Sequence, residues 1–402
     1  MSSATSTATV CASSLSTRAV AAEALKEAAE SAREALGGTP DLAFLFVSPH
    51  HARAADGLAK EACELLGTGN LLGCTGESIV GSGREVEEEP ALSLWLARLP
   101  GAKLTTLHLE FERTREGNVL EGWPDELSGE WAAGSFLIVL GEPFSFPADY
   151  LLERMNEDRP GVQVVGGMAS GAAQPGENRL LLGPKTFAEG AVAVHVSGGV
   201  RLRTVVSQGC RPIGKHFVVT KAERNIIYEL GGKPALAQLR EIFDTLPASE
   251  QRLVQTALHV GRVVSEYQER FEQGDFLVRN VAGIDATTGA IAIGDYIRAG
   301  QTVQFHIRDQ EAADAELKQL LAGAKSQTSS LPAGGLLFTC NGRGTRMFRE
   351  ADHDAGAVAH AFGSLPLAGF FAQGEMGPIG TQNFMHGFTA SLALFETIQA
   401  GE

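Results

Sequence analysis

The stretch that decides the fold of this chain is Leu71-Leu72-Gly73-Cys74-Thr75-Gly76-Glu77-Ser78. Before it come an apolar strand pattern at 44–47 and a helical pattern that runs through Leu65, and after it comes a strand pattern at 92–99. The order is therefore strand, helix, strand, glycine turn and strand. Internal repeats of this kind set the whole architecture of a chain, so any further copy of this order is decisive for the fold.

The same order returns about 92 residues later, with Gly166 standing 93 residues after Gly73. The second copy consists of an apolar strand at Phe136–Leu140, a helix through Met155, the stretch Val164-Val165-Gly166-Gly167-Met168-Ala169-Ser170-Gly171 and a strand at Ala191–Val196. A weaker third copy consists of Leu336–Cys340, a helix around Ala355–Phe362, Leu367–Phe371 and Phe388–Phe395. The chain is thus expected to contain three similar lobes.

Each copy predicts a parallel βαβ unit with an antiparallel neighbour, because a strand, a crossover helix and a second strand are followed closely by a third strand. Duplicated lobes bury the open faces of their sheets most simply by packing sheet on sheet with the helices outside. We therefore expect an α/β (α+β) protein in which duplicated βαβ-type lobes form mixed sheets, packed as a layered sandwich with outer helices.

The pattern changes between the second and third copies. Two short strands are expected at 215–221 and 226–230, and helical patterns follow through Leu239–Phe243 and again through Val254–Phe271, which places His259 on a helix. Alternating apolar and polar residues then predict half-buried strands at 276–280, 290–293 and 302–307. This part is a second module, which the third copy completes.

Composition excludes several classes of function. Asp and Glu outnumber Lys and Arg by 48 to 33, and the resulting net charge of −15 repels nucleic acid and anionic membranes at long range. The longest apolar stretches, such as Leu42–Val47, are far shorter than the ~20 residues that span a bilayer. We therefore expect neither nucleic acid nor a membrane as a partner.

The cysteines predict a reducing environment. The five are Cys11, Cys63, Cys74, Cys210 and Cys340, which are scattered and form no C-x-x-C pair. This spacing favours neither a disulfide framework nor a zinc site, so we expect free thiols in a cytoplasmic protein. The histidines, including His50, His51 and His386, show no metal-ligand spacing, and no phosphate-binding loop or nucleophile-elbow motif is present. We expect no metal, no cofactor and no assigned catalytic residue.

The candidate site lies where the repeated strands end. Ligands favour the carboxyl ends of parallel strands, and glycines there allow the backbone to approach a ligand closely. The same glycines could instead serve chain reversal alone. Our candidate ligand-binding residues are Cys340, Asn341, Arg343, Gly374, Glu375, Gly73, Cys74, Glu77, Gly166 and Gly167.

The side chains among them suggest specific roles. Arg343 and Asn341 are suited to a carboxylate, because guanidinium pairs with planar anions and the carboxamide both donates and accepts hydrogen bonds. Glu375 stands between glycines and could receive an ammonium group, as could Glu77. The alternatives are that Cys340 is a small buried hydrophobe, that Arg343 faces solvent and that Glu375 stabilises a turn. The acidic run at 85–89 is interpreted as a solvated face.

These motifs together resemble the FIST family (F-box and intracellular signal transduction). The resemblance rests on the following segments: Asp41-Leu42-Ala43-Phe44-Leu45-Phe46, Leu72-Gly73-Cys74-Thr75-Gly76-Glu77, Val165-Gly166-Gly167, Gly283-Ile284-Asp285, Cys340-Asn341-Gly342-Arg343-Gly344 and Gly369-Phe370-Phe371-Ala372-Gln373-Gly374-Glu375-Met376-Gly377-Pro378. It implies a FIST N-like domain over 10–220, containing two repeated lobes, and a FIST C-like domain over 221–402.

The resemblance further implies a sensory module that binds small ligands, with amino acids or their derivatives proposed. We accordingly expect a stand-alone cytoplasmic signal-transduction protein that binds an amino acid or small carboxylate and passes its signal to an unidentified protein partner. Two alternatives stay open. One is a thiol-dependent hydrolase or transferase that uses Cys340 with Glu375 or His386 as base, and the other is a protein-interaction scaffold without a ligand.

Overall fold

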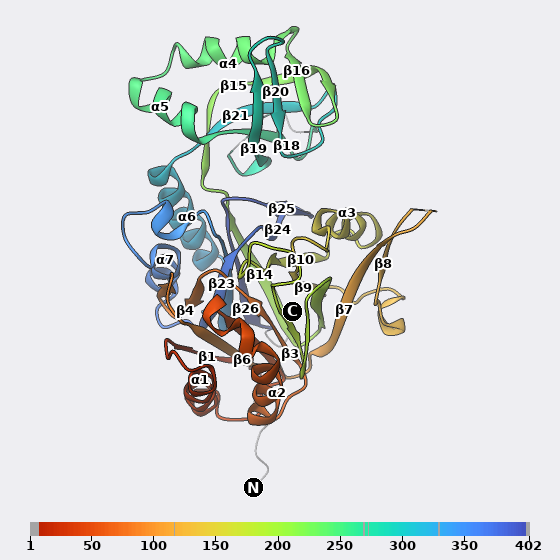
Figure 1. Ribbon diagram of the computed structural model, residues 1–402, viewed down its shortest axis with the longest axis vertical. Coiled ribbons are helices and arrows are strands. Elements are labelled where there is room, and N and C mark those ends of the chain that lie inside the picture. The colour runs from red at the N-terminus through yellow and green to blue at the C-terminus, as the bar shows by residue number, and fades with distance from the viewer. Residues whose placement is uncertain (1–7, 116, 268–269, 272, 329, 399–402) are drawn as a thin grey trace. The chain divides into compact units, whose positions relative to one another are not determined.

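The computed structural model describes residues 8–115, 117–267, 270–271, 273–328 and 330–398 (Figure 1). Contacts divide the chain into two compact units. The first unit contains the described residues of Met1–Val206, Lys318–Met385 and Thr389–Glu402, and the second contains those of Ser207–Leu317 and His386–Phe388. The domain boundary expected at residue 220 does not coincide with this division, because the third lobe belongs to the same compact unit as the first two.

Three tandem repeats build the first unit. The first repeat consists of β1 (Val10–Ser16), α1 (Ala21–Leu36), β2 (Leu42–Val47), η1 (Pro49–Ala54), α2 (Ala55–Leu66), β3 (Leu71–Thr75), β4 (Ile79–Gly81), β5 (Arg84–Val86) and β6 (Leu92–Arg98). The second consists of β7 (Lys103–Arg113), β8 (Asn118–Glu121), η2 (Asp125–Leu127), β9 (Phe136–Gly141), α3 (Ala148–Asp158), β10 (Gln163–Met168), β11 (Leu180–Leu182), β12 (Lys185–Phe187) and β13 (Ala191–Ser197). The third consists of β14 (Val200–Ser207), α6 (Gln310–Ser326), β22 (Gly334–Cys340), η4 (Gly344–Arg346), α7 (His353–Phe362), β23 (Leu367–Ala372), β24 (Glu375–Ile379), β25 (Gln382–His386) and β26 (Ala390–Thr397). Contacts assign Ser207 of β14, residues 310–317 of α6 and His386 of β25 to the second unit.

Each repeat forms the centre of one mixed sheet. Parallel pairs join β2 to β3, β9 to β10 and β22 to β23, and an antiparallel strand flanks each pair as β6, β13 or β26. The predicted βαβ units with antiparallel neighbours, and with them the α/β fold class, are confirmed.

The repeats exchange hairpins in a cycle. The β4–β5 hairpin of the first repeat extends the third repeat's sheet beside β23, the β11–β12 hairpin of the second extends the first repeat's sheet beside β3, and β24–β25 of the third extends the second repeat's sheet beside β10. Each sheet is therefore completed by residues more than 100 positions away in sequence. This exchange explains why the three lobes form one compact unit.

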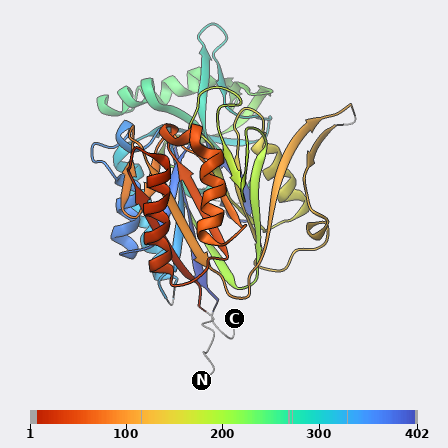
Figure 2. The ribbon, with the colours of Figure 1, turned by 60° about the horizontal axis from the view of Figure 1, so that its bottom comes forward.

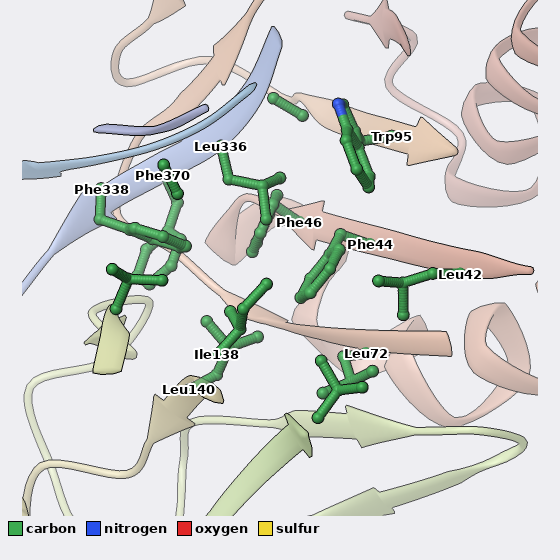
Figure 3. Packing of buried hydrophobic residues seen from close by; sticks show 14 of the residues in the cluster. Leu42, Phe44, Phe46, Leu72, Trp95, Ile138, Leu140, Leu336, Phe338 and Phe370 are labelled. Atoms are coloured by element: carbon green, nitrogen blue, oxygen red, sulfur yellow. The ribbon is translucent and has the colours of Figure 1, made fainter. Parts of the chain in front are cut away.

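A shared core lies between the inner faces of the three sheets (Figure 3). Strand alternation directs Phe44 and Phe46 of β2 into this core, together with Ile138 of β9 and Phe338 of β22. The ring of Phe46 lies 5.2 Å from that of Phe370, so aromatic contacts join the first and third repeats. The opposite faces of β2 and β9 pack against α1 and α2 and against α3, respectively, which places these helices outside, as predicted (Figure 2).

The second unit is a closed barrel. It consists of β15 (Cys210–Glu223), β16 (Ile226–Leu230), β17 (Lys233–Pro234), α4 (Ala235–Phe243), α5 (Ala248–Ala257), β18 (Leu258–Val263), η3 (Gln273–Asp275), β19 (Phe276–Asp285), β20 (Ala290–Ile293) and β21 (Thr302–Arg308). The long strand β15 pairs with β21 and also with β16, which closes the ring β15-β21-β18-β19-β20-β16.

The predicted helix over 254–271 is wrong for the described residues from 258 onward, and residues 268 and 269 lie outside the described residues. Residues Leu258–Val263 form the strand β18, with His259 paired to both His306 and Asn280. Pairing to two neighbours therefore overrides the local helical pattern. None of the helices formed by the described residues combines the length and apolar character needed to cross a membrane.

Candidate functional site

The ends of β3, β10 and β23 meet in the first unit, as predicted. The Ser170 N–H donates to the Thr75 carbonyl (3.1 Å), and the Ser170 hydroxyl donates to the Phe371 carbonyl. The Glu77 N–H in turn donates to the Ser170 hydroxyl (2.8 Å). One residue of the second repeat thus links the strand ends of all three repeats, and these hydrogen bonds occupy the polar groups that a ligand would otherwise meet there.

The repeated glycines lie inside strands rather than in turns, which corrects the sequence interpretation. A Cβ added at Gly73 would lie 1.9 Å from the Leu45 carbonyl oxygen, and one at Gly166 would lie 1.8 Å from that of Val139. Gly369 repeats the arrangement in the third lobe, 1.8 Å from the Leu337 oxygen. Because a neighbouring backbone cannot move aside, glycine is required at all three positions by the close approach of the parallel strand.

Two further candidates are also packed within the strands. A Cβ at Gly167 would lie 2.9 Å from that of Ala372, and Cys74 is fully buried in the shared core, where burial raises the pKa of its thiol. Gly374 has a φ of 155°, and its carbonyl accepts the Met168 N–H (2.9 Å). These residues hold neighbouring repeats together.

Arg343 is fully buried and is bound to a carboxylate of the protein itself. Its Nε donates to Oδ2 of Asp354 (2.7 Å) and its Nη2 to Oδ1 (2.8 Å), while the guanidinium lies over the ring of Phe348 at 5.1 Å. The hydroxyl of Thr339 and Nδ1 of His353 also bond Asp354. Burial alone would raise the pKa of Asp354, but Arg343 outweighs it and holds that pKa below its ordinary value.

Arg343 therefore does not face solvent, and its guanidinium binds a carboxylate of the protein where a ligand carboxylate was expected. Asp354 occupies the bidentate face of the guanidinium, and such a buried pair is strongly favoured over either partner alone. Nothing in the sequence spacing of 343 and 354 identified this pairing.

Glu375 is fully buried at the start of β24. Its Oε2 accepts the Thr389 N–H (3.1 Å), but its Oε1 has no hydrogen-bond partner among the residues that the structure describes. Burial raises the pKa of Glu375 well above the ordinary range, and the Thr389 N–H, the charge of Arg343 and a hydrogen bond from Cys340 offset this only in part. Burial thus favours the protonated form of this carboxyl, and its Oε1 makes no hydrogen bond within the described structure.

Glu85 is a second buried carboxyl, and the sequence interpretation missed it. The hairpin exchange carries Glu85 of β5 to α7, where its Oε1 accepts the Ala355 N–H (2.8 Å) and its Oε2 is without a partner within the described part of the chain. Burial first, and then the negative charge of Asp354, raise the pKa of Glu85 to about 8. The sequence interpretation of residues 85–89 as a solvated face is therefore wrong for Glu85, which is buried.

Cys340 and Asn341 lie at the end of β22, beside these groups. The Gly342 N–H donates to Sγ of Cys340 (3.4 Å), and the thiol is only 6% exposed. Asn341 is half-buried, and its carbonyl accepts Nη1 of Arg346 (2.7 Å). Arg346 is exposed and pairs with Glu77, which places that predicted acid in an ion pair at the surface of the site.

The structure thus brings together Cys340, Arg343 and Glu375, since each appears in the electrostatic surroundings of another. Sequence reasoning omitted Asp354, Glu85 and Arg346. Within the described ranges, no group of three or more His, Cys, Asp or Glu side chains is arranged to hold a metal ion.

Comparisons with known proteins identify two domain models that follow one another along the chain. The FIST N domain model matches residues 41–233, and the FIST C domain model matches residues 235–378. An uncharacterized protein of Mycobacterium tuberculosis (strain H37Rv) is 45% identical over 373 residues, which are 92% of this chain and 96% of that protein. An uncharacterized protein of Mycobacterium bovis is 42% identical over 376 residues, 93% of this chain and 96% of its own length.

A shorter similarity extends to F-box only protein 22 of Pongo abelii, which is 34% identical over 82 residues, 20% of each chain. The chain belongs to the FIST family. FIST domains are generally sensory signal-transduction domains that bind small ligands.

Proposed function

We propose that this chain is a cytoplasmic sensor of an amino acid or a related small carboxylate, bound where the loops after β22 and β23 meet. The observation that carries the proposal is Oε1 of Glu375, a fully buried carboxyl oxygen without a hydrogen-bond partner in the described structure. A buried polar atom of this kind is costly unless something bonds to it. The five cysteines, all free thiols, suit a reducing cytoplasm.

In this proposal Glu375 receives the ammonium group of the ligand. Burial raises the pKa of this carboxyl and thereby favours its protonated form. An adjacent ammonium favours the ionised form, so binding lowers the pKa and releases a proton. Proton release on binding is a signature that an ordinary surface site would not produce.

The ligand carboxylate is assigned to Asn341 and Arg346, since Asp354 already occupies Arg343. Arg346 is 55% exposed, and its surface pair with Glu77 is easily exchanged for another carboxylate because exposed ion pairs contribute little. Arg343 keeps an indirect role, because its charge lowers the pKa of Glu375. The backbone at Gly374 positions Glu375.

The test is calorimetric titration with amino acids and small carboxylic acids, repeated in buffers of different ionisation enthalpy. We expect one chemical group of ligands to bind with release of protons, and Glu375→Gln to abolish that release. Arg346→Ala should weaken binding at least fivefold, whereas Glu89→Gln, which changes an exposed acid that the proposed site does not use, should leave it unchanged. The absence of heat and of any rise in melting temperature at millimolar ligand would refute the proposal.

A second candidate is thiol chemistry at Cys340. The Gly342 N–H points at Sγ, and Arg343 lies close enough to interact electrostatically with the thiol. Both features stabilise a thiolate. Burial raises the thiol pKa of Cys11 and of Cys74.

Iodoacetamide labelling at neutral pH separates the two candidates. If Cys340 is a nucleophile, it should react at least tenfold faster than the other four cysteines, and Arg343→Met should slow it. If Cys340 reacts no faster than half-buried Cys63, this second candidate fails while the sensor proposal stands.

A further inference from the structure

The outer edge of β8 is exposed and borders a groove in the first unit. The groove has a volume of about 530 Å³ and is formed by β8, the segment around η2, and α3. Its apolar lining comes from Val119, Leu120, Trp123, Leu127, Leu151 and Met155. The β7–β8 hairpin that carries this edge extends away from the rest of its sheet (Figure 2).

The main chain of β8 faces this groove. Strand β8 is the last strand of its sheet and pairs with β7. The Tyr150 hydroxyl donates to the Asn118 carbonyl (2.9 Å), which shows that the polar groups of Asn118 point away from β7. Because main-chain direction alternates along an antiparallel strand, Leu120 also points outward, whereas Val119 points toward β7. An outward edge of this kind is a template for another strand.

The surroundings are strongly acidic. Between residues 110 and 159, leaving out Glu116 and the buried Glu142, ten exposed Asp and Glu side chains stand against four Arg, a surplus of six negative charges. Arg154 at the groove is itself paired with Glu157 and Asp158. The guanidinium of Arg159 donates to backbone carbonyls, including that of Gly129 (2.9 Å). These cations are therefore engaged within the protein.

We propose that β8 and this groove bind an extended, basic segment of another protein by strand addition. Main-chain hydrogen bonds to the Asn118 N–H and to Leu120 supply affinity, alternate apolar side chains enter the groove, and lysines or arginines meet the acidic rim. The charge argues against a second copy as the occupant, since two such surfaces in a chain of net charge −15 repel each other. This inference does not depend on the ligand proposed above.

The experiment uses the full chain and a seven-residue peptide that alternates lysine with valine and leucine. Binding is followed by calorimetry and by the fluorescence of Trp123, with a Trp123→Phe variant to identify the signal. The comparison peptides replace lysine by glutamate, or keep the charge and carry N-methyl groups that remove the strand hydrogen bonds. We expect the first peptide to bind and each comparison peptide to bind at least tenfold more weakly.

Matched variants separate strand addition from charge attraction. Asn118→Pro removes an outward N–H without removing a bond to β7, so we expect at least fivefold weaker binding, whereas Asn118→Ala should stay within twofold. If Asn118→Pro disturbs folding, the double variant Glu112→Lys/Glu121→Lys keeps the main chain and should weaken binding similarly. Three results would overturn the proposal. The first is that folded Asn118→Pro and Asn118→Ala bind the lysine peptide equally well. The second is that the N-methyl or the glutamate peptide binds the wild type as tightly as the lysine peptide does, and the third is that the lysine peptide does not bind at all. Self-association of the free chain that Asn118→Pro abolishes would also overturn it, because the occupant would then be a second copy.

Discussion

Replacing Glu85 by Gln should stabilise the protein, and more so at high pH. In the unfolded chain Glu85 ionises near its ordinary pKa of 4.5, whereas burial and the charge of Asp354 raise its folded pKa to about 8. Between these values the unfolded state has released a proton that the folded state still holds, so stability falls as pH rises. The slope is about 1.4 kcal/mol per pH unit for one such group.

The expected gain follows from that slope. At pH 7 the full linkage amounts to about 3 kcal/mol, and we expect Glu85→Gln to recover about 1–3 kcal/mol of it because local relaxation reduces the shift. The gain should shrink to about zero below pH 4.5, where Glu85 is protonated in both states. The amide oxygen of Gln still accepts the Ala355 N–H, and its NH2 group can donate toward Asp354.

The assay is urea unfolding of the wild type and of Glu85→Gln between pH 4.5 and 8. Glu89→Gln serves as the matched control, since it removes the same charge from an exposed position nearby. The raised pKa of Glu375 contributes equally to the wild type and to both variants, so it cancels when their free energies of unfolding are subtracted. A difference between Glu85→Gln and the wild type that is constant with pH, or that grows as pH falls, would refute the reasoning.

Three further predictions concern the glycine positions, the buried ion pair and the barrel. Gly369→Ala should cost at least about 3 kcal/mol in denaturant unfolding or prevent folding, because its Cβ would meet the Leu337 oxygen, whereas Gly57→Ala in α2 meets nothing and should be neutral or stabilising by up to about 1 kcal/mol. Arg343→Met should cost about 3–5 kcal/mol by leaving Asp354 unpaired, and the double variant Arg343→Met/Asp354→Leu should recover most of that loss; a double variant as unstable as the single one would contradict the account. Burial lowers the pKa of His306 to about 4, so an NMR titration should give its midpoint near that value, and stability should fall as pH drops from 6.5 toward 4; a midpoint above 6 would contradict this.

Local pattern was enough to predict the repeated units. The apolar runs at β2, β9 and β22, each followed by an amphipathic helix and a glycine-containing strand, are short-range features, and the structure places them in equivalent positions. The meeting of the three strand ends also followed, because parallel strands in related units end on the same side. The sequence therefore placed Cys340 and Glu375 near these strand ends, and their role in binding a ligand stays a prediction.

The local sequence pattern did not predict how distant segments pair. The helical periodicity through β18 gave the wrong structure there, because strand partners on both sides decide the conformation of residues 258–263. The glycines of the repeats were taken for turns, since sequence shows a missing side chain but does not show the carbonyl that requires its absence.

The sequence alone thus determined that the chain contains repeated βαβ units and how many there are, because helix and strand periodicity depend on neighbouring residues. The tertiary structure alone decided which polar groups are occupied. Asp354 takes up the guanidinium of Arg343, and the exchanged hairpin carries Glu85 out of its own repeat and buries it beside the third repeat's helix. The physical reason is that a charge changes its pKa and its partner according to burial and distance in space, and neither quantity is written in the spacing of residues along the chain.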